Sequence, residues 1–161
     1  MAQFLKSNQL NAELERIFDE AKTDLILISP YIKIHSRYRD ILKLKKENAK
    51  LKVTLVFGKN EDDITKSLSQ DDFELLKDFP NVEIKYEPRL HAKYYSNETM
   101  SLLSSMNLYD FSQNNNIEFG ILTNGSIMSG MKDVLVNDKI DSEALKYFDQ
   151  VIFFPKTLFL L

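Results

Sequence analysis

Residues 24–58 constrain the fold more than any other part of the chain. Four consecutive apolar residues at 25–28, closed by Ser29-Pro30, predict a strand that is buried on both faces of an α/β sheet. Residues 36–48 carry apolar side chains at helical spacing, and 51–57 form a second apolar run that ends at a glycine. Strand, helix and strand in this order predict a βαβ unit with parallel strands and a right-handed crossover.

The rest of the chain adds further predicted elements around this unit. Helices are expected at about 8–22, at about 70–79 behind the capping pair Ser69 and Asp72, and once or twice between 126 and 150; strands are expected at about 82–86, 90–95, 99–103 and 116–122. The apolar carboxyl-terminal segment predicts a buried final strand or a subunit contact. Residues 1–161 are therefore predicted to form a single α/β domain, with a mixed sheet of about six to eight strands sandwiched between helices.

The amino-acid composition limits the reactions that the side chains of this chain can catalyse. The chain contains no cysteine, which excludes disulfides and thiolate chemistry, and only 2 histidines, which disfavours a zinc site built from its own side chains. We therefore expect neither a metal nor another cofactor. The amino terminus lacks the pattern of a secretory signal and no apolar run approaches the ~20 residues of a membrane span, so a cytoplasmic protein without membrane contact is expected.

Charge is distributed unevenly along the chain. The net charge of −3 argues against binding to nucleic acid through overall charge, but residues 33–52 are strongly basic and 61–78 lean acidic. Within or beside the predicted basic helix, four residues are weak candidates for nucleic-acid contacts: Lys33, Arg37, Lys45 and Lys46. A solvated helix face explains the same pattern equally well.

The segment around His91 carries the chemistry. If residues 90–95 form a strand, its period of two places His91, Lys93 and Tyr95 on one face. An imidazole beside an ammonium suits reactions at phosphorus, because the imidazole can attack or transfer protons while the ammonium neutralises phosphoryl oxygens. A half-exposed strand with a polar face is the alternative explanation.

Downstream residues favour the chemical explanation. Ser104, Ser105 and Asn107 supply two hydroxyls and an amide directly after an apolar run. Glu118 follows on the predicted strand 116–122, opposite its apolar side chains Ile117, Phe119 and Ile121. A carboxylate placed there can hydrogen-bond one imidazole nitrogen and so leave the other nitrogen available for attack.

Taken in order, these residues resemble the signature of the phospholipase D superfamily. The signature is His-x-Lys, an acid seven residues after the histidine, Ser-x-Asn, and a final glutamate, and the resemblance covers about residues 23–123. Three features depart from it: the acid is Glu98 where the family usually has Asp, Ser104 stands where Gly usually precedes the serine, and the Ser-x-Asn comes about one residue early.

The resemblance implies a metal-independent phosphodiesterase that acts through a phosphohistidine. His91 would be the nucleophile and Glu118 would orient its ring, while Lys93, Ser105 and Asn107 would hold the phosphate. The supporting positions around the site would be Glu98, Ser104 and Asn116. The chain has one His-x-Lys, and His35 fits a loop or helix start, so a homodimer with its active site on the twofold interface is expected.

The sequence is compatible with three hypotheses for the substrate or ligand. The backbone of DNA or RNA is the first hypothesis, because the resemblance is to the branch of small bacterial nucleases with a single motif. A phospholipid or small phosphodiester is the second hypothesis. A dimeric nucleic-acid-binding module without catalysis is the third, because the altered acid and the missing glycine both lie close to the expected site.

Overall fold

The computed structural model describes residues 2–6, 8–109, 117–124 and 139–160. Its elements in chain order are β1 (Gln3–Lys6), α1 (Asn8–Glu20), β2 (Asp24–Ile28), β3 (Ile32–Lys33), α2 (Ser36–Lys45), β4 (Lys52–Phe57), the 3-10 helix η1 (Ile64–Lys66), α3 (Gln70–Lys77), β5 (Val82–Tyr86), β6 (Tyr94–Asn97), β7 (Met100–Ser104), β8 (Leu108–Tyr109), β9 (Phe119–Asn124), α5 (Lys139–Phe153) and β10 (Lys156–Leu160). Within this described part, a mixed 8-stranded sheet has the order β1-β9-β7-β6-β2-β4-β5-β10, and β3 pairs separately with β8. The predicted fold class is confirmed.

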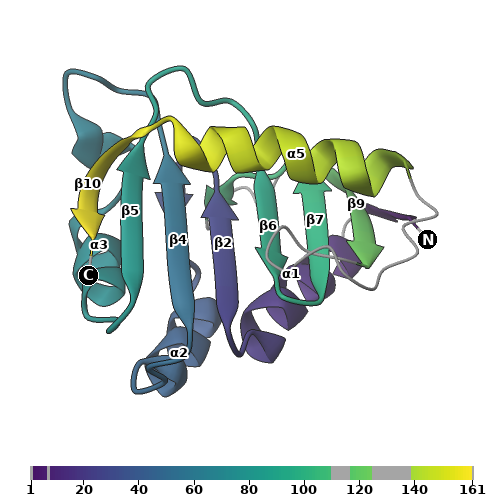
Figure 1. Ribbon diagram of the computed structural model, residues 1–161, viewed down its shortest axis with the longest axis horizontal. Coiled ribbons are helices and arrows are strands. Elements are labelled where there is room, and N and C mark those ends of the chain that lie inside the picture. Colours follow the sequence, from purple (N-terminus) through teal and green to yellow (C-terminus); the bar gives the residue numbers. More distant parts are fainter. Residues whose placement is uncertain (1, 7, 110–116, 125–138, 161) are drawn as a thin grey trace.

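The predicted βαβ unit consists of β2, α2 and β4. β2 and β4 pair in parallel, with Leu25 opposite Val53, and β4 pairs in parallel with β5. The helix cap expected at Ser36 is one residue earlier: His35 caps α2, because its Nδ1 accepts a hydrogen bond from the Arg37 N–H at 3.3 Å. The three parallel strands end at the same edge of the sheet, which is the upper edge in Figure 1 and is called the carboxyl edge below.

Helices cover both faces of the sheet (Figure 1). α1, α2 and α3 pack on one face, where Phe18 joins Leu27 and Leu55 in the larger core cluster. α5 crosses the other face, where the Phe148 ring stacks on Tyr94 with 4.3 Å between centroids. After Asp24, β2 is apolar because its alternate side chains enter these two cores.

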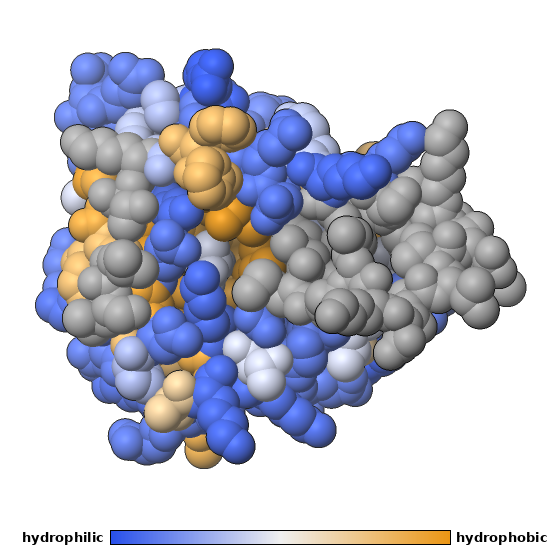
Figure 2. Space-filling model, viewed as in Figure 1, coloured by the Kyte–Doolittle hydropathy of each residue, from blue (hydrophilic) through white to orange (hydrophobic). Residues whose placement is uncertain are grey.

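The carboxyl end of α5 carries exposed aromatic side chains. Phe153 and Phe154 are 78% and 75% exposed, and apolar surface (orange in Figure 2) gathers where α5 meets β10. Of the helices that the structure describes, none has the length and apolar character needed to cross a membrane.

Antiparallel strands complete the sheet at both sides. β1 pairs with β9, and β10 pairs with β5 with a register shift between Thr157 and Phe159. The strand hypothesis for the carboxyl-terminal segment is confirmed, although β10 lies at the sheet edge, where Leu158 is exposed. β1 was not predicted because four residues are too few to show a strand period.

The strand predicted at 90–95 begins later than expected, at Tyr94. β2 supplies its last partner at Ile28, opposite Tyr94. Beyond Ile28 the chain leaves the sheet at Ser29-Pro30, where proline has no N–H for a ladder bond. His91 and Lys93 therefore lie on irregular backbone ahead of β6.

Candidate active site

The predicted catalytic and phosphate-binding residues meet at the carboxyl edge. β2 and β4 end there, β7 ends there with Ser104, and β9 begins there with Phe119. His91 and Lys93 lie immediately before β6, which begins at the same edge. Ligands of open α/β sheets bind at such an edge, where strand ends and loops from distant parts of the chain come together.

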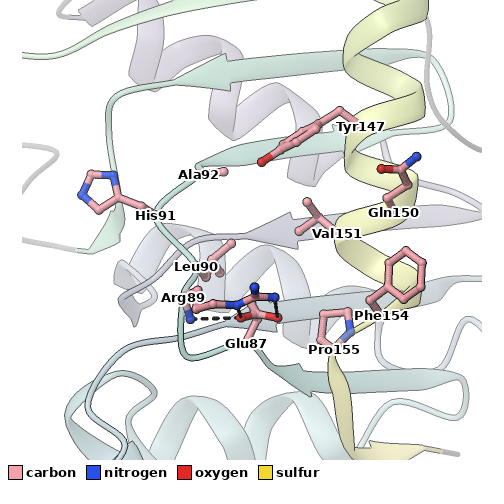
Figure 3. A pocket seen from close by; sticks show the side chains of 10 residues that line it. All are labelled: Glu87, Arg89, Leu90, His91, Ala92, Tyr147, Gln150, Val151, Phe154 and Pro155. Atoms are coloured by element: carbon pink, nitrogen blue, oxygen red, sulfur yellow. Dashed lines mark hydrogen bonds and ion pairs between the residues drawn. The ribbon is translucent and has the colours of Figure 1, made fainter.

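His91 is itself exposed, but the segment that carries it packs closely against the end of β4. A Cβ atom at Gly58 would lie 2.1 Å from the Glu87 carbonyl oxygen and 2.7 Å from Leu90 Cβ, so only glycine permits this approach. Leu90 and Ala92 pack toward α5. Figure 3 shows the His91 imidazole pointing away from α5, on the other side of the segment.

Backbone hydrogen bonds join the His-x-Lys segment to the Ser-x-Asn segment. The Ser104 N–H donates to the Lys93 carbonyl oxygen at 3.1 Å. Ser104 Oγ donates to the Phe119 carbonyl oxygen at 2.9 Å and accepts from the Met106 N–H at 2.9 Å. Ser104 is buried, so its hydroxyl does not face solvent; its N–H and its hydroxyl together connect the Lys93, Met106 and Phe119 backbones.

Ser105 holds Glu118. Its Oγ donates to the Glu118 carboxylate and accepts from the Phe119 N–H at 3.1 Å. The Ser105 N–H in turn donates to the Phe119 carbonyl oxygen at 3.0 Å. These bonds fix the carboxylate relative to the turn that follows β7.

The apolar side chains that flank Glu118 do not enter the core. Ile117 is fully exposed, Phe119 is 49% exposed, and the Phe119 ring stacks on exposed Phe4 with 5.8 Å between centroids. Gly120 and Leu122, which alternate with them, are buried instead. We call Phe4, Ile117 and Phe119 the β9 patch; it forms an apolar rim next to Glu118.

Lys93 lies between opposing electrostatic influences. Partial burial lowers the pKa of its ammonium below the ordinary value, the Glu118 carboxylate raises it, and the Lys59 ammonium lowers it further. Lys59 was not predicted as a site residue. The only sequence signal for it was its place directly after a predicted strand that ends at the carboxyl edge.

Asn107 has a fixed backbone and a polar side-chain atom without a partner. The Tyr95 hydroxyl donates to the Met106 carbonyl oxygen at 2.7 Å, and the Leu108 N–H donates to Ser29 Oγ at 3.0 Å. Burial raises the pKa of Tyr95 well above its usual range, so this donor stays protonated. Asn107 Oδ1 is buried and has no hydrogen-bond partner in the described part of the chain. Such a group is costly in a folded protein and is a common feature of ligand sites.

Glu98 lies at the opposite edge of the sheet, at the end of β6. Its carboxylate accepts hydrogen bonds from three consecutive backbone N–H groups, those of Lys22 at 3.0 Å, Thr23 at 3.4 Å and Asp24 at 3.3 Å. These bonds close the turn between α1 and β2. Glu98 is therefore placed to support the fold, far from the His91 segment.

Two of the four predicted basic contacts lie at the carboxyl edge. Lys33 is in β3, whose partner β8 directly follows Asn107, and its Nζ lies 5.8 Å from the centre of the Tyr109 ring. Arg37 is in the first turn of α2 and forms an ion pair with Glu15 at 2.8 Å. The structure thus brings Lys33 close to the site and leaves Arg37 at its periphery.

The other two basic residues lie at the far end of α2. Lys45 Nζ donates to the carbonyl oxygens of Asp19 at 2.6 Å and Ala21 at 2.8 Å, where α1 ends. Lys46 forms an ion pair with Asp78 at 2.5 Å. Both side chains are engaged in the fold at the edge opposite the histidine, so their contact with nucleic acid stays a prediction for a surface outside the site.

Asn116, the remaining predicted site residue, lies outside the described residues. Within 2–6, 8–109, 117–124 and 139–160, no group of three or more His, Cys, Asp or Glu side chains is arranged to hold a metal ion.

A groove of about 350 Å³ separates residues 87–92 from the carboxyl-terminal half of α5 (Figure 3). Tyr147 and Phe154 line it and are 59% and 75% exposed. Arg89, at its mouth, forms an ion pair with Glu87 at 2.9 Å. The groove was not predicted, because a loop and a helix distant in sequence form it together.

Comparison with known proteins finds similarity in structure only. No protein-family model and no curated protein sequence matches the chain. A phospholipase D family member, Nuc from Salmonella typhimurium, matches with a TM-score of 0.65 and 12% identity over 98% of this chain and 97% of its own. NucT from Helicobacter pylori matches with a TM-score of 0.68 and 12% identity over 98% and 99%.

A larger protein contains the same arrangement. Phosphatidylserine synthase from Haemophilus influenzae Rd KW20 matches with a TM-score of 0.66 and 16% identity over 98% of this chain but 39% of its own. At identities of 12% to 16%, what these proteins share with the chain is the fold.

Proposed function

We propose that this chain, which has the phospholipase D fold, is a metal-independent phosphodiesterase whose substrate is the backbone of DNA or RNA. The observation that carries the proposal is the meeting of His91-x-Lys93, Ser105-x-Asn107 and Glu118 at one sheet edge. Hydrogen bonds between Ser104 and Lys93 and between Ser105 and Glu118 hold these segments together. The near-complete overlap with two chains of similar size supports the same proposal.

In the proposed first step, His91 attacks the phosphorus of the diester. A ring nitrogen forms the new N–P bond, one P–O bond breaks, and the leaving oxygen takes a proton from His91 of a second copy of the chain. The exposed position of His91 and the direction of its imidazole suit an attack on a polymer that approaches from solvent.

Water completes the proposed cycle. The second histidine removes a proton from a water molecule, whose oxygen attacks the phosphorus while the N–P bond breaks. The products are an alcohol and a phosphate monoester, and both histidines return to their starting protonation states. No metal is needed at either step.

The remaining side chains would stabilise and position the reacting groups. Lys93 would neutralise the non-bridging oxygens, and the Asn107 amide would donate to them. Because the Ser105 hydroxyl already donates to Glu118, we propose that it fixes this carboxylate for its role in orienting an imidazole. If Ser105 also contacts the phosphate, its bond to Glu118 would fix the position of the hydroxyl that makes this contact.

A homodimer supplies the second histidine. The β9 patch supports this part of the proposal, because Phe4, Ile117 and Phe119 expose apolar surface directly beside Glu118. A twofold contact that covers this patch would bury apolar area and bring two copies of the site together.

The test is cleavage of single-stranded DNA, double-stranded DNA and RNA in excess EDTA. Wild type is compared with His91→Ala and with His35→Ala, which removes the other histidine of the chain at the start of α2. We expect cleavage by wild type and by His35→Ala, and none by His91→Ala. Quenching with an alkaline denaturant during turnover, which preserves an N–P bond, should trap a phosphorylated protein in wild type and in His35→Ala but not in His91→Ala.

The outcomes separate the hypotheses. Cleavage that needs added metal, or that survives in His91→Ala, would refute the mechanism. Tight nucleic-acid binding without turnover by wild type would favour a dimeric binding module. Absence of both binding and cleavage would exclude nucleic acid as the substrate.

The groove beside α5 favours a second candidate function, hydrolysis of a phospholipid or another small phosphodiester. Its exposed Tyr147 and Phe154 rings offer apolar contact to a substrate whose phosphate lies near His91. Release of headgroup from phosphatidylcholine or phosphatidylglycerol vesicles, measured with the same variants, tests this candidate. It fails if headgroup release by wild type does not exceed that by His91→Ala.

A further inference from the structure

The chain turns sharply where β4 ends at the carboxyl edge. Lys59 and Asn60 both have left-handed backbone, with φ of 69° and 48°. Asparagine tolerates this conformation, but for lysine it is strained, and strained positions of this kind are concentrated at functional sites. Surrounding bonds hold the corner, since the Tyr86 hydroxyl donates to the Lys59 carbonyl oxygen at 2.8 Å and Asn60 Nδ2 donates to Ser67 Oγ at 2.9 Å.

This corner lies against the catalytic segment. Gly58, directly before Lys59, packs so closely on Glu87 and Leu90 that no Cβ atom fits between them. The Lys59 ammonium is near enough to Lys93 to lower the pKa of that group. Lys59 therefore belongs to the same surface as the His-x-Lys segment.

Lys59 differs from the basic residues of α2. Arg37, Lys43 and Lys46 each form an ion pair with a carboxylate. Among the residues that the structure describes, no carboxylate lies within ion-pair distance of Lys59. The carboxylates of the same corner, Glu61 and Asp62, act on Tyr86. The charged groups that act on Lys93 are the Glu118 carboxylate and the Lys59 ammonium, so two ammonium groups share the side of the corner that faces Lys93, which favours an anionic ligand there.

We propose that Lys59 binds a phosphate group of a polynucleotide that flanks the phosphate cleaved at His91. The inference rests on the proposed function and adds a second phosphate subsite to it. Lys59 follows β4 and Lys93 precedes β6. Because β2 lies between these two strands, the backbones of the two lysines are about 10 Å apart. Successive phosphates of one strand advance by about 3.4 Å along a helix, so a chain of a few nucleotides spans both positions.

The experiment measures binding of a ten-nucleotide single strand and of a dinucleoside monophosphate, in EDTA and over a range of salt concentrations. All proteins carry His91→Ala, so that the strand is not cut. Lys59→Gln is compared with Lys66→Gln, which removes an exposed lysine that pairs with Asp63 in the same loop. Circular dichroism confirms that each variant is folded.

Loss of one phosphate contact has a defined signature. Lys59→Gln should weaken binding of the ten-nucleotide strand by roughly three- to ten-fold and reduce the slope of log K against log salt by about 0.7. Its effect on the dinucleoside monophosphate, which carries a single phosphate, should be smaller. Lys66→Gln should behave like the parent protein.

The possible results distinguish this inference from the proposed function. If the parent does not bind the strand, the nucleic-acid function fails and the subsite fails with it. If the parent binds but Lys59→Gln matches Lys66→Gln, only the subsite is refuted. Equal weakening for both ligands would place Lys59 on the cleaved phosphate and would also refute a flanking site.

Discussion

Substitution of Gly58 by alanine tests whether the end of β4 determines the position of His91. The new Cβ atom would meet the Glu87 carbonyl oxygen at 2.1 Å, whereas such contacts are essentially never shorter than 3.0 Å. The backbone of residues 87–90 must therefore move by about 0.9 Å, because neither partner is a flexible side-chain tip. His91 follows directly and would move with it.

Two effects of different size are expected. Overpacking of this kind lowers the free energy of unfolding by about 1–3 kcal/mol. Displacement of a reacting group by about 1 Å lowers kcat by as much as about 100-fold. Urea unfolding and turnover of the substrate that wild type cleaves measure the two effects, and the NMR shifts of the His91 ring report its displacement without reference to activity.

Gly120→Ala is the matched control. There a Cβ atom would meet the Cδ1 atoms of Leu10 and Leu102 at 2.7 and 2.8 Å, which are tips of flexible side chains in the core. We expect a similar or smaller loss of stability with most of kcat retained. If folded Gly58→Ala kept wild-type kcat and wild-type His91 shifts, the dependence of His91 on this contact would be refuted.

Two further predictions concern opposite parts of the molecule. Glu98→Ala should lower the free energy of unfolding by about 1–3 kcal/mol, because three backbone N–H groups lose their acceptor, while kcat of the folded protein stays near wild type. Glu47→Ala is the control in urea unfolding. A large loss of kcat in Glu98→Ala with an unchanged urea midpoint would contradict a structural role for Glu98. If the proposed dimer forms through the β9 patch, wild type should be dimeric in light scattering and Ile117→Asp monomeric, because it places a charge at a fully exposed position of the patch, whereas Leu44→Asp, at a position 87% exposed on α2, should stay dimeric.

The features that could be predicted from sequence are those that local patterns determine. The βαβ unit follows from two apolar runs and a periodic segment between them. The Ser69 cap of α3 was expected from its spacing to Asp72, whose N–H donates to Ser69 Oγ at 3.2 Å. The phospholipase D fold was expected from the types and the order of the motif residues. The spacing of the predicted strands alone does not show which of them are neighbours in the sheet.

Features that depend on tertiary contacts were not predictable. His91 was placed on a strand, but the strand begins at Tyr94 because the partner strand turns away at Pro30. The lysines of α2 suggested a nucleic-acid surface, yet Lys45 and Lys46 bond to groups from α1 and from the end of α3, which are distant in sequence. Lys59 shows the reverse case: no local sequence pattern marks it as a site residue, and its proposed role rests on its left-handed backbone and on its proximity to Lys93.

The proposed reaction needs an acid in addition to the attacking imidazole, and the proposed homodimer would supply it as a second His91. An imidazole that has formed the N–P bond cannot also be the acid that protonates the leaving oxygen on the opposite side of the phosphorus. The chain's other histidine, His35, has its Nδ1 engaged at the start of α2, and Glu118 accepts from Ser105. Lys93 is the remaining acid beside His91, and if it served, a monomer would turn over substrate. Activity of Ile117→Asp therefore decides the point: activity that falls in proportion to the dimer fraction requires the second His91, and activity retained by the monomer assigns the proton to Lys93.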